Sequence, residues 1–152
     1  MREFKTDLTG KVAVVTGARQ GLGKIFATAL AAAGAEVIIM ARNVKALEEA
    51  AAEIHAETGA ICHYCPIDIL DESSVEKAAR FVMDTCGRLD ILFNNAALGR
   101  GSTPLQDTSL EEWNATIGTN LTGTFLCMKH FGRIMIAQQS GKVINMTSLA
   151  AR

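Results

Sequence analysis

"TGARQGLG", residues 16–23, joins a continuous apolar run at 12–15 to a stretch with the apolar spacing of a helix. Gly17 permits a sharp exit from a strand, Gly21 lets the backbone approach a pyrophosphate, and Gly23 lets a helix pack closely on a sheet. The N–H groups at the start of that helix would bind the phosphates, aided by the helix dipole. We therefore predict a dinucleotide-binding loop that comprises Gly17, Arg19, Gln20, Gly21, Leu22 and Gly23.

A P-loop is the alternative phosphate-binding motif for this stretch, because Lys24 follows Gly23. The glycines are one residue too far apart for that motif, and Ile25 occupies the position where Ser or Thr holds Mg²⁺. The P-loop interpretation fails on both points.

Short apolar runs and helical patterns alternate along the rest of the chain, as in sheets whose two faces are both covered by helices. The alternation indicates an α/β fold, a Rossmann-like, doubly wound parallel sheet with five strands present. Since no helix follows the last strand, we expect the fold to be incomplete at its carboxyl end and residues 1–152 to be one truncated nucleotide-binding domain. The expected strands are 12–15, 37–40, 61–67, 91–93 and 142–147.

Capping boxes and apolar stripes predict where the helices begin and which faces they bury. Ser73 with Glu76 predicts the start of the third helix, and Ser109 with Glu112 predicts the start of a long fourth helix. The expected buried stripe of the first helix is Leu22, Ile25, Phe26, Ala29, Leu30 and Ala33, and that of the long helix is Trp113, Ile117, Leu121 and Met128.

Composition and charge limit the partners of the chain. Its 15 basic and 16 acidic residues are mixed, so there is no basic run to neutralise a nucleic-acid backbone. No apolar segment reaches the length of a membrane span, and the amino terminus lacks the apolar core of a signal peptide. We expect a cytoplasmic protein without nucleic-acid or membrane partners.

Four cysteines are too few for a disulfide framework in a cytoplasmic chain. The segment "CHYC" at 62–65 resembles a metal or redox motif, but it falls within a predicted strand. Residues three apart on a strand point to opposite faces. We therefore predict that Cys62 and Cys65 are small buried side chains and that the chain has no metal site.

The end of the second strand is expected to select between cofactors. An acidic side chain there binds the ribose 2′-OH of NAD, whereas an arginine accepts the 2′-phosphate of NADP. Residues 40–43 read "MARN", so the acid is absent and Arg42 is present, with Arg19 available from the glycine loop. We predict NADP(H) in preference to NAD(H), with Arg42 and Asn43 at the cofactor. The alternative for Arg42 is a solvated residue at a helix start.

Several further stretches resemble the short-chain dehydrogenase/reductase family in order and spacing. Besides the glycine loop, they are "PID" at 66–68, "GRLDILFNNAA" at 87–97, "EEWNATIGTNLTGTF" at 111–125 and "GKVINMTS" at 141–148. The resemblance implies hydride transfer between a nicotinamide cofactor and a small alcohol or carbonyl substrate.

The resemblance also implies roles for individual cofactor-binding residues. Asp68 would hydrogen-bond the adenine amino group while the backbone of Ile69 lies against the base; a turn or capping carboxylate is the alternative for Asp68. Asn95 and Ala96, in the family's Asn-Asn-Ala-Gly element, would border the nicotinamide ribose. Ala97 replaces the last glycine of that element, a mild departure.

Two residues match the family's catalytic positions. Asn120 would bend its helix so that its backbone carbonyl holds a water of the proton relay, with a satisfied core asparagine as the alternative. Ser148 would hydrogen-bond the substrate oxygen, with a serine that merely ends a strand as the alternative.

The family's Tyr-x-x-x-Lys motif is absent from the 152 residues. The sole tyrosine, Tyr64, is followed four residues later by Asp68. We therefore expect the chain itself to be an inactive cofactor-binding part of a longer, homo-oligomeric enzyme. A non-catalytic dinucleotide-binding or interaction module is the alternative.

Overall fold

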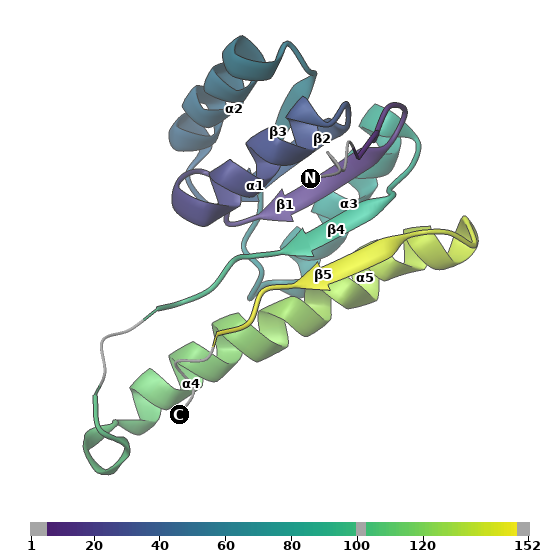
Figure 1. Ribbon diagram of the computed structural model, residues 1–152. Helices are drawn as coiled ribbons and strands as arrows, with labels where there is room; N and C mark the ends of the chain where they lie inside the picture. The colour runs from purple at the N-terminus through teal and green to yellow at the C-terminus, as the bar shows by residue number, and fades with distance from the viewer. Residues whose placement is uncertain (1–5, 100–102, 149–152) are drawn as a thin grey trace, which may run out of the picture.

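The computed structural model describes residues 6–99 and 103–148, which form one parallel sheet flanked by helices (Figure 1). The strand order is β3-β2-β1-β4-β5, and the chain winds outward from β1 to β3 before crossing to β4 and β5. This order confirms the predicted Rossmann-like α/β fold, with the direction of winding reversed between β1 and β4. The strands are β1 (Val12–Thr16), β2 (Glu36–Ala41), β3 (Cys62–Pro66), β4 (Ile91–Asn94) and β5 (Lys142–Asn145).

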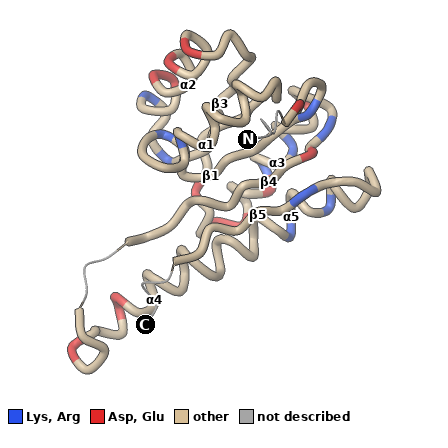
Figure 2. Tube along the Cα trace, in the orientation of Figure 1, with Lys and Arg blue, Asp and Glu red and all other residues tan. Residues whose placement is uncertain are grey.

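Helices cover the two faces of the sheet in pairs. Helices α1 and α2 bury one apolar cluster against the sheet, and α3 and α5 bury another on the opposite face. The helices are α1 (Gly21–Ala32), α2 (Val44–Thr58), α3 (Glu72–Cys86), α4 (Leu110–Ile117) and α5 (Thr124–Ala137), with a 3₁₀ turn, η1 (Leu105–Asp107), and a π-helix, η2 (Gly118–Gly123). No helix in the described ranges is long and apolar enough to cross a membrane. Acidic and basic residues are interspersed along the trace (Figure 2).

β1 is buried along its whole length because both faces of the sheet are covered at its centre. Val12 and Val14 belong to the cluster under α3 and α5, whereas Ala13 and Val15 belong to the cluster under α1 and α2. The two-residue period of a strand thus divides one apolar run between two cores.

The face that α1 buries differs from the predicted stripe. Leu22 and Ile25 are 60% and 61% exposed, while Gly23, Ala27 and Ala31 are buried against the sheet. A Cβ atom on Gly23 would lie 2.5 Å from the carbonyl oxygen of Gly17, so the close approach of this helix requires small residues. Phe26 and Leu30 of the predicted stripe do pack, partly buried, against this core, so the prediction was right for these two side chains and wrong for Leu22 and Ile25.

The capping residues of the later helices were predicted with mixed success. α3 begins at Glu72 with Asp71 as its N-cap, whose carboxylate accepts a hydrogen bond from Ser73 N–H at 2.9 Å, so the predicted box at Ser73 and Glu76 is wrong. The capping box before α4 is confirmed, since Ser109 and Glu112 exchange side-chain to backbone hydrogen bonds of 3.1 Å.

The long helix is interrupted and leaves most of its predicted stripe exposed, with Ile117 half-buried. α4, η2 and α5 run in succession, and α4 extends past the carboxyl ends of the strands (Figure 1). Trp113 and Leu121 are 50% and 63% exposed, and α4 has no buried residue within the described ranges. An amphipathic face is buried only where a partner lies against it, and the sheet does not reach this part of the helix. β5 is likewise exposed at each of its residues.

Asp90 joins the start of β4 to the start of β1. Its buried carboxylate accepts hydrogen bonds from Val12 N–H at 3.0 Å and from Arg88 Nε and Nη2 at 2.8 and 2.7 Å, and Lys11 Nζ lies 3.5 Å away. Burial opposes ionisation of this carboxyl, but Arg88, Val12 and Lys11 outweigh burial and hold the pKa of Asp90 below its ordinary value.

Glu72 joins the first turn of α3 to α5. One of its carboxylate oxygens lies 2.6 Å from Lys129 Nζ and 3.0 Å from Nε2 of the buried His130. Hydrogen bonds from Lys129 and then His130, together with their charges, lower the pKa of Glu72 to about 2.

The cysteines of β3 lie on opposite faces of the sheet, as the strand pattern predicts. Cys62 packs at the edge of the cluster under α1 and α2, and Cys65 is buried in the cluster under α3 and α5. Burial raises the pKa of Cys62 to about 11 and that of Cys127, in α5, to about 12. Neither group is therefore a reactive thiolate at neutral pH.

Candidate cofactor-binding site

A cavity of about 590 Å³ lies where the winding of the sheet reverses, the position at which open α/β sheets bind ligands. It is bordered by the segments that follow β1, β2, β3 and β4 and by part of the α4–η2 segment. Most of the cofactor-binding residues predicted from the sequence line it: Gly17, Arg19, Gln20, Gly21, Arg42, Asp68, Ile69, Asn95 and Ala96.

The glycine loop needs glycine for two physical reasons. Gly17 and Gly21 have φ angles of 67° and 59°, in the left-handed region that side chains disfavour. A Cβ atom on Gly17 would also lie 2.8 Å from the Cα of Ala96, so the backbones after β1 and β4 are in direct contact. The loop is fastened to β2 by Gly17 N–H, which donates to the carbonyl of Met40 at 2.7 Å.

The Asn-Asn-Ala element braces this loop through hydrogen bonds to Thr16 and Gly17. Thr16, buried at the end of β1, accepts hydrogen bonds at its hydroxyl oxygen from Asn95 N–H and Ala96 N–H, both at 3.1 Å. The side-chain amide of Asn95 donates back to the carbonyls of Thr16 and Gly17 at 3.0 and 3.3 Å. The floor of the cavity is therefore a reciprocal clamp between the ends of β1 and β4.

Asn94 faces the other side, toward β5. Its Nδ2 donates to Oδ1 of Asn145 at 2.8 Å, and its own Oδ1 is buried without a hydrogen-bond partner within the described residues.

Three predicted cofactor-binding residues lie outside the cavity lining. Leu22 is exposed on α1, and Gly23 serves the contact between α1 and the end of β1. Asn43 is the N-cap of α2, where its side chain accepts a hydrogen bond from Ala46 N–H at 3.0 Å. The structure thus gives Gly23 and Asn43 a local structural task.

The cavity carries positive charge near the end of β2. Arg19 and Arg42 both line it, and Asp68 is the acidic residue of the described lining. Arg19 Nη1 donates to the side chain of Gln20 at 2.6 Å, and Arg42 is exposed. A guanidinium pair without an acid at the end of β2 suits an anionic group such as a phosphate.

Asp68 combines its predicted position at the cavity with the structural role left open by the sequence. Its Oδ1 accepts a hydrogen bond from Leu70 N–H at 3.0 Å, and its own N–H donates to the Ser74 hydroxyl at 3.0 Å. The carboxylate therefore shapes the turn before α3 while it borders the cavity.

Asn120 lies within η2 and is exposed, so the alternative of a core asparagine is wrong. Its side chain instead hydrogen-bonds the loop after β4. Oδ1 accepts from Leu98 N–H at 2.8 Å, and Nδ2 donates to the Leu98 carbonyl at 3.3 Å. The carbonyl of Asn120 accepts a hydrogen bond from the Thr124 hydroxyl at 2.9 Å. The predicted helix irregularity at this residue is confirmed as a π-helix, a feature common at functional sites.

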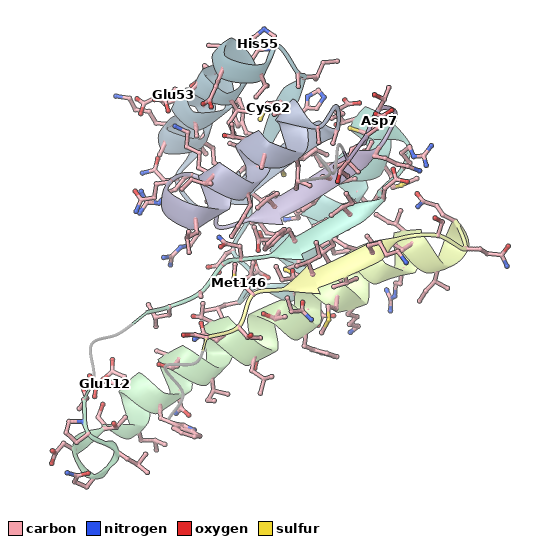
Figure 3. All side chains as sticks on the ribbon, viewed as in Figure 1. Asp7, Glu53, His55, Cys62, Glu112 and Met146 are labelled. Atoms are coloured by element: carbon pink, nitrogen blue, oxygen red, sulfur yellow. The ribbon has the colours of Figure 1, made fainter. Side chains whose placement is uncertain are left out.

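Ser148 is an exposed residue that follows β5, and neither it nor Asn120 is among the described residues that line the cavity. The segment leading to it is held by Met146, labelled in Figure 3, whose N–H donates to the Asn94 carbonyl at 2.9 Å.

Sequence reasoning did not select the residues that complete the cavity lining, which are Ala41, Ile67, Leu70, Ala97, Leu98, Ala115 and Thr119. A side chain that contributes only shape carries no chemical signal in a sequence.

A doubly wound parallel sheet with a glycine loop at its switch point is the architecture of dinucleotide-binding α/β proteins. The chain belongs to the short-chain dehydrogenase family, whose model matches residues 11–152. It is therefore a member of a family of oxidoreductases.

Relatives in this family differ in cofactor and substrate. The chain is 43% identical over 147 residues to a 3-oxoacyl-[acyl-carrier-protein] reductase of Synechocystis sp., covering 95% of this chain and 58% of the relative. A metagenomic short-chain oxidoreductase in complex with NADP matches with a TM-score of 0.86 at 37% identity, covering 93% of this chain and 64% of that one. An NAD⁺-bound xylitol dehydrogenase matches with a TM-score of 0.90 at 32% identity, covering 94% of this chain and 55% of that one. The chain thus spans between a half and two thirds of the length of each.

Proposed function

We propose that residues 1–152 form the cofactor-binding part of an NADP(H)-dependent oxidoreductase that interconverts an alcohol and a ketone or aldehyde. The observation that supports it most directly is the cavity at the switch point, with the glycine loop at its floor and two arginines beside the end of β2. The NADP complex of the metagenomic relative is consistent with this preference.

Each part of the cavity would take one part of the cofactor. The N–H groups at the start of α1 would bind the pyrophosphate, and Arg19 and Arg42 would bind the 2′-phosphate. Asp68 and the backbone of Ile69 would receive the adenine, and the Asn95–Ala96 segment would border the nicotinamide ribose. The bound cofactor would supply or accept the hydride, while these residues hold its orientation.

Asn120 and Ser148 would serve the reacting end of the site. The hydroxyl of Ser148 would hydrogen-bond the substrate oxygen, and the carbonyl of Asn120 would hold a water of the proton relay. The π-helix at this residue supports this role. The 152 residues include no Tyr-x-x-x-Lys motif, so we expect this chain to bind cofactor without reducing a carbonyl.

Fluorescence titration with NADPH and NADH tests the proposal. We expect NADPH to bind about tenfold or more tightly, since hydrogen bonds to charged groups contribute about 1.5–3 kcal/mol. R42A should weaken NADPH binding and leave NADH binding unchanged. R80A is the matched control, because Arg80 lies on α3 and pairs with Glu76. Equal or tighter NADH binding by the unchanged chain would remove Arg42 from its role.

A non-catalytic dinucleotide-binding module is the second candidate, favoured by the single tyrosine and its unsuitable neighbour Asp68. The DNA downstream of codon 152 distinguishes the two. A continuing frame that encodes Tyr-x-x-x-Lys supports the oxidoreductase, and a stop codon without such a frame supports the module.

We also propose that the protein is a homo-oligomer. The exposed apolar side chains Trp113, Leu121 and Phe125 on the α4–η2–α5 segment support association through this segment. Sedimentation of the chain as a monomer at micromolar concentration would contradict it.

A further inference from the structure

A cluster of three potential metal ligands lies at the amino-terminal edge of the sheet, opposite the cofactor cavity. It comprises Glu36, the first residue of β2, His63 in β3, and Cys86, the last residue of α3. Each is partly buried, and their donor atoms all lie within 4.8 Å of one another. Glu36 Oε1 is 2.7 Å from His63 Nε2 and 3.4 Å from Cys86 Sγ.

The fold explains why these three side chains meet. Ile38 pairs with His63 in the sheet register, and Glu36 precedes Ile38 by two residues, so Glu36 and His63 project from the same face. That face is covered by α3, which ends at Cys86. The three residues are thus presented by separate elements with fixed backbones.

We propose that Glu36, His63 and Cys86 bind one Zn²⁺ ion, with a fourth coordination position open to solvent. A carboxylate oxygen, an imidazole nitrogen and a thiolate sulfur are all zinc ligands, and zinc bonds of about 2.0–2.3 Å in a tetrahedron place ligand atoms about 3.5 Å apart. The two spacings from Glu36 Oε1, 2.7 and 3.4 Å, lie within 1 Å of that value, and all three ligand atoms lie within 4.8 Å of one another, so small side-chain rotations suffice.

The surroundings permit access of a cation. Glu36 and Cys86 line a surface hollow together with Lys11 and Arg88. Those two cations already pair with the buried carboxylate of Asp90, which reduces their repulsion of a metal ion. Burial and the Glu36 carboxylate raise the pKa of the Cys86 thiol to about 12, so zinc would displace its proton on binding.

The competing explanation is a hydrogen-bonded cluster without a metal, in which His63 and the Cys86 thiol both donate to Glu36. Titration of the metal-free, reduced 152-residue chain with Co²⁺ and then Zn²⁺ separates the two explanations. We expect one Co²⁺ per chain, a thiolate-to-cobalt charge-transfer band in the near ultraviolet, and loss of that band when Zn²⁺ is added.

Matched variants identify the ligands. C86S should abolish the cobalt band, and H63Q should weaken zinc binding at least about tenfold, since even indirect partners of a metal site contribute that much. C62S and H55Q are the controls: Cys62 faces the other side of β3, and the ring of His55 bonds the carbonyl of Ala60 at 2.8 Å (Figure 3). Both controls should bind as the unchanged chain does.

Three results would overturn the zinc site. They are the absence of the thiolate-to-cobalt band in the unchanged chain, a band that persists in C86S, and a loss of the band in C62S equal to the loss in C86S. Circular dichroism checks that each variant is folded. If C86S is not folded, the comparison of H63Q with H55Q decides, and equal zinc affinity in those two variants rejects the site.

Discussion

Replacing Thr16 with valine tests the clamp between the ends of β1 and β4. T16V keeps the size and the β-branch of the side chain but removes the oxygen that accepts from Asn95 N–H and Ala96 N–H. An orphaned buried N–H costs about 1–3 kcal/mol, and since both residues are half-buried we take the lower value for each, about 2 kcal/mol in total. For a chain of this size about 2–4 °C is lost per kcal/mol, so the melting temperature should fall by about 4–8 °C.

T16S is the matched control for this prediction. It keeps the accepting oxygen and removes one buried methyl group, which contributes about 0.8 kcal/mol. Thermal unfolding followed by circular dichroism should therefore rank the unchanged chain above T16S and T16S above T16V. A melting temperature for T16V equal to that of the unchanged chain, or a lower one for T16S than for T16V, would refute the clamp.

Three further perturbations follow from the described contacts. G17A forces a side chain into a left-handed conformation and against the Cα of Ala96; we expect it to lower stability by about 1–3 kcal/mol in urea unfolding, and an unchanged midpoint would contradict this. Because the pKa of Glu72 is lowered from 4.5 to about 2, its stabilising contribution is complete above pH 4.5 and is lost as the pH falls toward 2, so the melting temperatures of E72Q and the unchanged chain should differ at pH 7 and converge near pH 2. N120A removes both hydrogen bonds to Leu98, so the Leu98 amide should exchange with solvent faster; unchanged protection would show that the loop is held by other contacts.

The parts of the fold that could be predicted from sequence are those set by local chemistry. The exit from β1 needs glycine at position 17 because the φ angle there is 67°, and the capping box before α4 involves residues three apart. The doubly wound order follows from alternating strands and helices, because parallel strands require crossover connections. The location of most predicted cofactor-binding residues around one cavity could be predicted from the same order of strands and helices.

Errors arose where a distant element decided the outcome. α1 turns its small residues to the sheet because Gly23 must approach Gly17 and Asn95, a contact that no helical stripe encodes. Asp71 was passed over as a cap because its role depends on where the turn after Asp68 ends.

The cluster of Glu36, His63 and Cys86 was missed for a related reason. The spacing of "CHYC" drew attention to two cysteines on opposite faces, whereas the partners of His63 come from β2 and α3. Glu36 is 27 residues from His63 and 50 residues from Cys86 along the chain. Such a combination becomes visible only when the strand register is known.

The π-helical segment between α4 and α5 also determines how far the side chains of α4 are rotated about the helix axis relative to those of α5. A regular helix advances about 100° per residue, so the wider turn at Gly118–Gly123 offsets the apolar face of α4 from that of α5. Deletion of one residue there would restore a regular helix and turn α4 by about 100°, carrying the side chain of Asn120 away from Leu98. The segment should therefore tolerate substitution better than any change in its length.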